Sequence, residues 1–336
     1  MNDLMDKTTS QSKNNLPIKA AVPVFGAMLA IILCLSVTVI VLAVNLGGKK
    51  DDEAEEPTVT EAYVPIVNTR VYDFYSEGDY VYFDDPYYGS VWLPAFTDVP
   101  RHTYDYSGLV LKNGRYIYSE DGVQISRTGI DVSYHQGDID WERVAADGID
   151  FVMLRLGYRG YESGALNVDG RFHEYAKGAS DAGLDIGVYF YSQALNTEEA
   201  IEEANFVMEN IRGYDITFPV VFDWEVVEDA AARTNDIEPF TVTECAAAFC
   251  DTVSDGGYTP MVYGSGKYAL FKLNMSKLAN YDFWFAEYKD GHTEPNFPYN
   301  YTIWQYASDG TVDGIEGDVD LNICFADYGR TAVAAE

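Results

Sequence analysis

The sequence predicts an α/β fold, namely an irregular (β/α)8-type barrel whose late helices are missing, preceded by a single transmembrane helix and a small β-rich region. Three observations lead to this prediction: an uncharged apolar run near the start of the chain, Tyr-rich segments with frequent turns after it, and eight short apolar runs in the remainder. We expect five regions: a cytoplasmic tail at 1–19, a transmembrane helix at 20–48, an acidic linker at 49–62, a small β-rich juxtamembrane region at 63–126 and the barrel domain at 127–330.

The apolar run near the start predicts an uncleaved membrane anchor. No charged residue lies between Lys19 and Lys49, and about 20 apolar residues are enough to cross a bilayer as one helix. A cleaved signal peptide has a shorter apolar region, of about 7 to 15 residues. Lysines flank the run on both sides, so the charge bias that sets orientation is weak. The acidic run from Asp51 to Glu56 is typical of a solvated linker.

Short runs rich in Tyr, Val and Phe, such as YVYFDD and LVLKNGRYIYSEDG, predict a small all-β unit within 63–126. Asn113 and Gly114 stand between two alternating runs, which is a strong signal for a two-residue hairpin turn. The aromatic side chains of this unit either pack a small sheet or bind sugars, and packing is the commoner use of such residues.

From Gly129 onward, short apolar runs alternate with amphipathic stretches, a pattern typical of βαβ units and a parallel sheet. The runs are GIDVS, FVMLRLG, DIGVYFYS, FPVVFDWE, TPMVYGS, DFWFAEY, YTIWQYA and DVDLNICF. Eight strands predict a closed barrel. Helices are expected at 141–147, 170–182, 197–211 and 242–253. After Ala279 the runs follow each other too closely for full helices, because a parallel crossover needs about a dozen residues.

The run PVVFDWE carries the strongest candidates for catalysis. Its apolar part predicts a buried strand, and because side chains alternate between faces, Asp223 and Glu225 point the same way while Trp224 points opposite. Two neighbouring carboxylates cannot both ionise freely, which is one route to a protonated acid beside an ionised partner. Glycoside hydrolysis needs this division of roles. The alternative is that both are ordinary solvated residues at a strand exit.

Acidic residues also occur in two other predicted strands, at Asp131 in GIDVS and at Asp320 in DVDLN. In a parallel barrel the carboxyl ends of the strands share one face, where catalytic groups collect. We therefore expect Asp131 and Asp320 beside Asp223 and Glu225, although the depth of Asp131 within its short strand is open.

Other side chains of the predicted strands are candidates for substrate binding. Arg155 interrupts an apolar strand and needs an anionic partner if it faces inward, so a structural ion pair and a substrate contact are equally compatible with the sequence. About half of the aromatic residues are expected to be core, because alternate residues face opposite sides. The candidates are Arg155, Tyr189, Tyr191, Tyr263, Trp284 and Trp304, with Tyr306 in the same strand set.

Several classes of function are disfavoured. The formal net charge of −32 disfavours binding to nucleic acid. No zinc-type, P-loop or G-x-S-x-G motif is present, so we expect neither a metal nor a cofactor. Among the four histidines, only His135 lies near a candidate catalytic strand, and a loop position is its commoner use. Cys245 and Cys250 are five residues apart in a predicted helix, too far for easy bridging, so we expect buried free thiols.

The motifs together resemble glycoside hydrolase family 25, the cell-wall muramidases. The similarity extends from about Gly129 to Phe325 and rests on GIDVSYHQGDIDW, FVMLRLGYRG, DIGVYFYS, FPVVFDWE, MVYGS, FWFAEY and IWQYAS with DGTVDGIEGDVDLN. It implies an irregular α/β barrel that cleaves the β-1,4 bond between N-acetylmuramic acid and N-acetylglucosamine. The chain departs from many relatives at Phe190, where they carry His, and this leaves subsite detail open.

The resemblance also implies roles for the four carboxylates. Glu225 matches the general acid, Asp223 orients the substrate acetamido group or a water, and Asp131 and Asp320 shape the charge of the site. The partner is then the peptidoglycan glycan strand, and the location a bacterial cell membrane with the barrel outside. Two alternatives are a catalytically inactive wall-binding scaffold on the same barrel, which would be expected to lack a carboxylate, and an unrelated barrel hydrolase for another polysaccharide.

Overall fold

The computed structural model describes residues 80–85, 89–289 and 294–328, all of which belong to one compact unit that spans residues 63–336. The expected transmembrane helix at 20–48, together with the tail and the acidic linker, lies outside the described residues. Within the described part, no helix is both long and apolar enough to cross a membrane.

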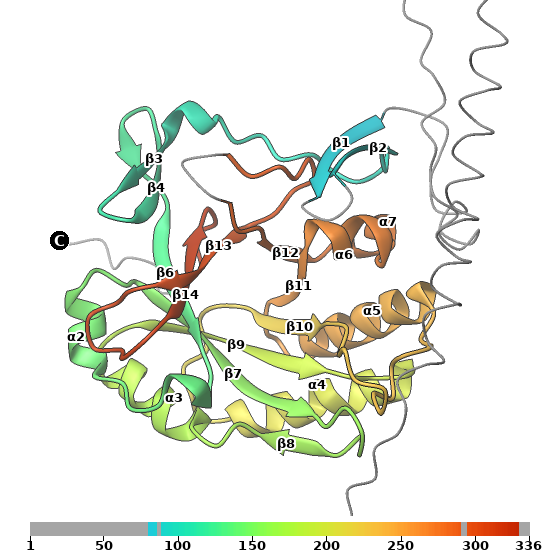
Figure 1. Ribbon diagram of the computed structural model, residues 1–336. Helices are drawn as coiled ribbons and strands as arrows, with labels where there is room; N and C mark the ends of the chain where they lie inside the picture. Colours follow the sequence, from blue (N-terminus) through green and yellow to red (C-terminus); the bar gives the residue numbers. More distant parts are fainter. Residues whose placement is uncertain (1–79, 86–88, 290–293, 329–336) are drawn as a thin grey trace, which may run out of the picture. The chain divides into compact units, whose positions relative to one another are not determined.

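Eight strands close into a barrel, as the sequence predicts (Figure 1). The barrel strands are β6 (Arg127–Val132), β7 (Phe151–Arg159), β9 (Asp185–Ser192), β10 (Val220–Trp224), β11 (Pro260–Ser265), β12 (Asp282–Ala286), β13 (Ile303–Gly310) and β14 (Val319–Cys324). Pairing of β6 with both β14 and β7 closes the ring. The short strand β8 (Leu166–Val168) pairs with the end of β7 and lies outside the ring.

One feature of the barrel differs from the prediction. The expectation of parallel strands is wrong for β14, which runs antiparallel to both β13 and β6. The physical reason is the short connection: β13 ends at Gly310 and β14 begins at Val319, so the chain has no room for a crossover and returns directly along the barrel wall.

The helices cover part of the barrel, and the sequence predicts the first four of them but not the last two. They are α2 (Trp141–Ala146), α3 (Phe172–Asp181), α4 (Thr197–Ile211), α5 (Pro239–Asp255), α6 (Gly266–Phe271) and α7 (Met275–Leu278). Between β12 and β14 the described residues form no helix, which agrees with the expected loss of the late helices. In Figure 1, α3, α4 and α5 lie on the side of β7, β9 and β10, away from β13.

Residues of the β-rich region cover the outer side of the late strands. This region holds the hairpin of β1 (Tyr80–Asp85) and β2 (Gly89–Pro94), the turn η2 (Tyr106–Gly108), and a sheet of β3 (Leu109–Lys112), β4 (Arg115–Glu120) and β5 (Val123–Gln124). The predicted turn between β3 and β4 is confirmed, because Asn113 and Gly114 both have positive φ, at 53° and 79°.

Two tyrosines of β4 take the place of a helix against the barrel. Tyr116 packs on Trp304 with ring centroids 4.8 Å apart, and Tyr118 packs on Phe325 at 5.4 Å. Tyr104, just before η2, stacks on Phe325 at 4.4 Å. These side chains belong to the same buried cluster as the outer faces of the barrel strands, so they complete the hydrophobic core where helices are missing.

The lower part of the barrel interior is a second, apolar cluster. Its buried members are Phe151, Met153, Phe218, Val221, Met261, Trp284, Ile303 and Cys324. Two inward glycines make room for the large ones, because a Cβ at Gly129 would lie 2.2 Å from the Phe151 ring and one at Gly187 would lie 2.5 Å from Met153 Sδ. This part of the interior is therefore packed with side chains.

Candidate active site

All four predicted carboxylates lie at one end of the barrel. Asp131 is the second-last residue of β6, Asp223 is the second-last of β10, and Glu225 directly follows β10. Asp320 is the second residue of β14. Because β14 runs antiparallel to its neighbours, its beginning lies at the end where the parallel strands finish, so the grouping holds although the expected direction of this strand does not.

Asp131 and Asp320 form a directly opposed pair across β6 and β14. Directly opposed residues of an antiparallel pair have Cβ atoms about 5 Å apart. Burial raises the pKa of both carboxyl groups, that of Asp320 to about 6, and the charge of Asp320 raises the pKa of Asp131 further. Like charges this close oppose double ionisation, so the pair holds a proton to a higher pH than an isolated aspartic acid.

Two side-chain amides hold Asp131. Gln305 Nε2 and Asn322 Nδ2 each donate a hydrogen bond to Asp131 Oδ2, both at 2.8 Å. Both donors are buried, as is Asp131 itself, which is 6% exposed. Hydrogen bonds to the charged form favour ionisation and so oppose the effect of burial on the pKa. The Asp131 carboxyl is therefore held rigidly in place.

Aromatic side chains determine which way these amides point. Trp284 Nε1 donates to Asn322 Oδ1 at 2.8 Å, and an indole N–H can only donate, so the amide nitrogen of Asn322 must face Asp131. Tyr263 and Tyr288 donate their hydroxyls to Gln305 Oε1 at 2.8 and 2.7 Å. This leaves the nitrogen of Gln305 for Asp131. The pocket around Asp131 is thus supported by a second layer of hydrogen bonds.

Asp223 has a buried oxygen without a partner. The residue is 5% exposed, and among the described residues no group donates a hydrogen bond to its Oδ1. Burial raises the pKa of Asp223, the charges of Glu225 and Asp131 raise it further, and the charge of Arg155 lowers it. A buried acceptor without a donor is costly, so this oxygen is suited to accept a hydrogen bond from a bound molecule.

Glu225 is half-buried, and no side-chain hydrogen bond links it to another described residue. Burial raises its pKa, and the negative charge of Asp320 adds to this effect. A carboxyl group with a raised pKa keeps its proton nearer to neutral pH, which a general acid requires.

Arg155 has the anionic partner that its sequence context requires. Its Nε donates to Asp169 Oδ2 at 2.8 Å, and the Asp169 side chain is 1% exposed. The guanidinium also lies 5.0 Å from the centre of the Tyr134 ring. Arg155 is therefore ion-paired with Asp169 at the edge of the site, and its charge also acts on Asp223.

The predicted aromatic residues divide by the face on which they lie. Tyr191 and Tyr263 both pair in register with Asp223, from β9 and β11, whereas Tyr189 lies lower, opposite Val221. Tyr189 and Tyr263 each meet the Trp284 ring edge to face. Trp284 is 2% exposed and lies beneath the site.

Trp304 is not brought into the site. It lies on the outer side of β13, 1% exposed, where it packs on Tyr116 and Tyr306. His135 is exposed on the loop after β6, as expected. Cys245, Cys250 and Cys324 are buried free thiols, also as expected.

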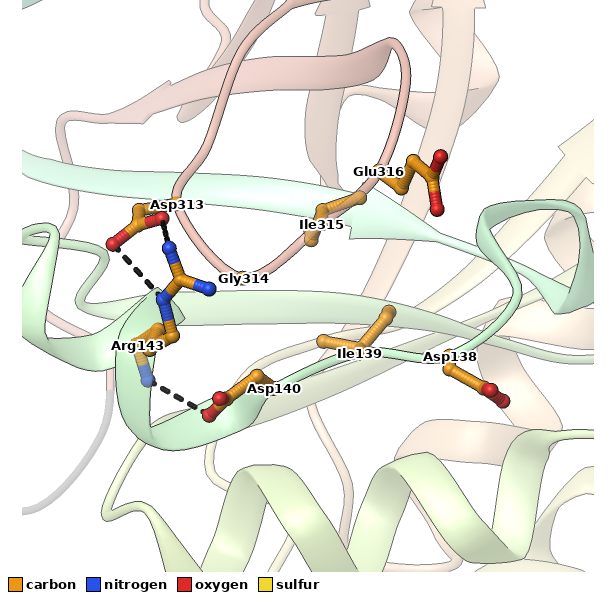
Figure 2. Close-up of a pocket in the computed structure, with 8 residues that line it drawn as sticks. All are labelled: Asp138, Ile139, Asp140, Arg143, Asp313, Gly314, Ile315 and Glu316. Carbon is orange, nitrogen blue, oxygen red and sulfur yellow. Dashed lines mark hydrogen bonds and ion pairs between the residues drawn. The ribbon is translucent and has the colours of Figure 1, made fainter.

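A separate cavity of about 500 Å³ contains none of the four carboxylates (Figure 2). It lies where the loop after β6 meets the loop between β13 and β14. The lining residues are Asp138, Ile139, Asp140, Arg143, Asp313, Gly314, Ile315 and Glu316. Figure 2 shows Arg143 turned toward Asp313, and Arg143 Nε donates to Asp313 Oδ2 at 3.1 Å. The cavity is acidic and its arginine is paired, so it offers nothing that specifically attracts an anionic group.

The described residues include no group of three or more His, Cys, Asp or Glu side chains arranged to hold a metal ion. The arrangement fits acid–base chemistry by carboxyl groups: burial raises the pKa of all four, Asp223 has a buried acceptor atom without a donor, and two amides hold Asp131 in place.

Sequence reasoning missed several residues of the site. Gln305 and Asn322 lie in the quoted runs YTIWQYA and DVDLNICF, and both are polar positions in otherwise apolar strands, which was an available signal. Tyr288 follows β12, is 49% exposed and reaches Gln305 with its hydroxyl. Gln193 and Tyr268, which contact the backbone beside Glu225, carried no such signal.

Comparison with known proteins shows which family this chain matches. The sequence profile described as "Glycosyl hydrolases family 25" matches residues 130–315. The chain is 27% identical over 194 residues to the autolytic lysozyme of Clostridium acetobutylicum, and this match covers 58% of this chain and 54% of that protein. It is 26% identical over 223 residues to lysozyme M1 of Streptomyces globisporus, covering 58% of this chain and 66% of that protein.

Among solved structures, the chain resembles the modular autolysin LytC of Streptococcus pneumoniae in complex with a synthetic peptidoglycan ligand. The TM-score is 0.53 at 26% identity, covering 64% of this chain and 52% of that one. The chain thus spans about half the length of the autolytic lysozyme and about half the length of LytC.

Proposed function

Because the chain belongs to glycosyl hydrolases family 25, we propose that its barrel hydrolyses peptidoglycan, at the β-1,4 bond between N-acetylmuramic acid and N-acetylglucosamine. The observation that carries this proposal is the grouping of Asp131, Asp223, Glu225 and Asp320 at one end of the barrel. The names of the similar proteins support it: two are lysozymes, and one is an autolysin in complex with a peptidoglycan ligand.

In this proposal Glu225 is the general acid. It donates its proton to the glycosidic oxygen as the bond between that oxygen and the anomeric carbon breaks, and positive charge develops on the sugar ring. The raised pKa of Glu225 supports this role, since the group is protonated at a pH where an exposed glutamate is not. After the transfer, the Glu225 carboxylate takes up a proton from water and is neutral again.

Asp223 orients the group that attacks the anomeric carbon. Its free Oδ1 is the acceptor for the N–H of the substrate acetamido group, whose carbonyl oxygen then attacks, or for a water that attacks directly. The two routes differ in product stereochemistry: attack by the acetamido oxygen, followed by attack of water that opens the resulting oxazoline ring, gives net retention, and direct attack by water gives inversion. The anomer released first, observed by proton NMR, distinguishes them.

Asp131 and Asp320 supply negative charge beside the developing positive charge, which stabilises the transition state electrostatically. Their rigid setting supports this role, because the two amides on Asp131 keep the carboxyl from moving away during the reaction. Tyr191 and the exposed ring of Tyr288 lie where sugar rings would pass and are the aromatic contacts that we assign to substrate. The charge of Arg155 favours the ionised form of Asp223, against the larger effects of burial and of the neighbouring carboxylates.

We also propose that residues 20–48 anchor the chain in a bacterial cell membrane, with residues 127–330 outside. The apolar sequence supports the anchor, and a wall substrate requires the outer location. Protease added to intact cells is expected to remove the barrel. Full protection of the barrel, with cleavage only after lysis, would contradict the outside location.

The experiment for the activity compares wild-type protein with Glu225→Gln on purified peptidoglycan. We expect Glu225→Gln to abolish release of soluble glycan while the circular dichroism spectrum stays unchanged, since the amide is isosteric but cannot donate an acidic proton. Glu228→Gln, close in sequence but outside the four-carboxylate group, is the matched control and should retain full activity. An inactive wild-type protein that still binds the wall would instead support the scaffold alternative.

A further inference from the structure

The strand that carries the catalytic pair stops just before Glu225. Pairing of β10 with β9 ends at Trp224, which lies opposite Ser192, and pairing with β11 ends at Asp223. The peptide bond between Glu225 and Val226 therefore lies beyond both ladders. If its carbonyl and N–H had no other partners, no hydrogen bond would hold the backbone at the proposed general acid in place.

Side chains from both neighbouring strand ends hold this one peptide bond. Gln193, the first residue after β9, donates from Nε2 to the backbone oxygen of Glu225 at 3.0 Å. Tyr268, in the helix that directly follows β11, accepts from the backbone N–H of Val226 at 2.5 Å. Both polar atoms of the same peptide group are thus bound, one from each side.

Gln193 is itself fixed. It is fully buried, its Nε2 also donates to the Ser192 carbonyl at 2.9 Å, and its Oε1 accepts from Thr234 Oγ1 at 2.7 Å. The backbone oxygen of Gln193 accepts from Arg233, whose guanidinium is bound by both carboxylate oxygens of Glu199 at 2.7 and 2.9 Å. The amide cannot turn without breaking several of these bonds.

Tyr268 is fixed by packing and by its place in the chain. Its ring meets the Trp224 indole edge to face with centroids 6.0 Å apart. Its backbone N–H bonds to the capping oxygen of Ser265, where β11 passes directly into α6. A rigid helix start thus sets the position of the hydroxyl.

We propose that Gln193 and Tyr268 are positioning residues that clamp the Glu225–Val226 peptide bond and so hold the Glu225 carboxyl in its reactive orientation. This rests on the proposed function. The Glu225 side chain makes no hydrogen bond to another described residue, so its direction depends on its backbone. An error of about 1 Å in the position of a catalytic group costs about 100-fold in rate, and sites are held by such supporting residues.

The first test is Tyr268→Phe, which removes the hydroxyl and keeps the ring against Trp224. We expect kcat on soluble glycan strands to fall about 10- to 100-fold, with KM changed less than about threefold, because the clamp does not touch substrate. Gln193→Met, which keeps the shape and loses both donors, is expected to act in the same direction. Tyr281→Phe is the matched control, since that hydroxyl bonds Asp251 far from the site, and it should leave both constants unchanged.

A second readout is independent of hydrolysis. Titration of 13C-labelled Glu carboxyls by NMR, with the Glu225 signal assigned by its loss in Glu225→Gln, measures the pKa of this group. Loss of the clamp lets the carboxyl reach water, so its pKa is expected to fall toward the ordinary value in Tyr268→Phe. The titratable groups that face Glu225 are Asp131, Asp223, Asp320, Tyr191, Tyr263, Tyr268 and Tyr288.

These readouts separate the two claims. If the wild-type protein does not cleave glycan, the proposed function fails, and the NMR titration alone decides the clamp. If Tyr268→Phe keeps both the kcat and the Glu225 pKa of the wild type, the clamp is overturned while the function stands. A variant that loses thermal stability but keeps the wild-type kcat per folded molecule also overturns it, because the role is then structural only.

Discussion

Replacing Tyr118 with alanine tests whether the β-rich region is part of the barrel's core. Tyr118 is 1% exposed, and its ring meets both Tyr104 and Phe325. Its hydroxyl accepts from the Asp105 backbone N–H at 3.1 Å. Tyr118→Ala removes the ring from the place where the barrel lacks a helix, so a cavity forms between β4 and the end of β14.

The cost can be worked from the buried area. A buried tyrosine hides about 150–250 Å², which at about 25 cal/mol/Å² amounts to about 4–6 kcal/mol as an upper bound. Measured costs of truncating buried aromatic residues are about 3–5 kcal/mol. For a unit of this size each kcal/mol corresponds to about 2–4 °C in Tm, so we expect a fall of about 6 to 20 °C.

The assay is a thermal melt of the detergent-solubilised full chain, followed by near-ultraviolet circular dichroism. Tyr80→Ala is the control, because Tyr80 is 63% exposed and surface substitutions change stability by about 0.5 kcal/mol or less. A Tyr118→Ala protein that melts within error of the wild type would refute the reasoning, since the β-rich region would then contribute nothing to the barrel core.

Three further predictions concern charge. The negative charge of Asp320 raises the pKa of Glu225, so Asp320→Asn should lower that pKa. The alkaline limb of the residual pH–rate profile should then move to lower pH, and a limb that does not move would contradict the coupling. The folded-state pKa of Asp320 is raised to about 6 from 3.8, so its ionisation destabilises the fold as pH rises through that window. The same variant should therefore gain Tm at pH 7 and gain none at pH 3, and equal gains at both pH values would count against this. Finally, the net charge of −32 opposes approach to an anionic wall, and salt screens this repulsion. Cosedimentation with purified wall should therefore increase with salt, and a decrease would contradict this prediction.

The barrel and its four carboxylates could be predicted because both depend on local patterns. Apolar runs of strand length mark the strands, and a sudden acidic residue at the end of such a run marks Asp223 and Glu225. The direction of β14 was missed although the sequence carried a signal for it: an alternating pattern is the same in either direction, but the connection after β13 is too short for a parallel crossover. Asp320 reaches the site by the start of its strand rather than by its end.

The face of the strand on which a side chain lies was harder to predict than the position of the strand in the sequence. Trp304 lies in a run whose two faces both carry large apolar residues, since Ile303 packs in the barrel interior and Trp304 is covered by Tyr116 on the outside. Alternation then carries no information about which side is inside. The contribution of the β-rich region to the core was equally hidden, because nothing in its composition distinguishes a cover for the barrel from a separate small sheet.

The supporting hydrogen bonds were missed for a physical reason. Gln305 and Asn322 lie 174 and 191 residues from Asp131 in sequence, and the Gln193 amide acts on the backbone of Glu225 rather than on its side chain. Such contacts exist only once the barrel has closed, so a local pattern can mark Gln305 and Asn322 as polar positions in apolar strands but cannot show what they bond.

The most direct test of the central claim is the identity of the new chain ends after digestion. Purified peptidoglycan is treated with the wild-type protein, the products are reduced with borohydride, and the reduced sugars are identified by mass spectrometry. Cleavage at the proposed bond predicts that reduced N-acetylmuramic acid accumulates with time and is absent with Glu225→Gln. Accumulation of reduced N-acetylglucosamine instead, or of neither sugar, would contradict the claim.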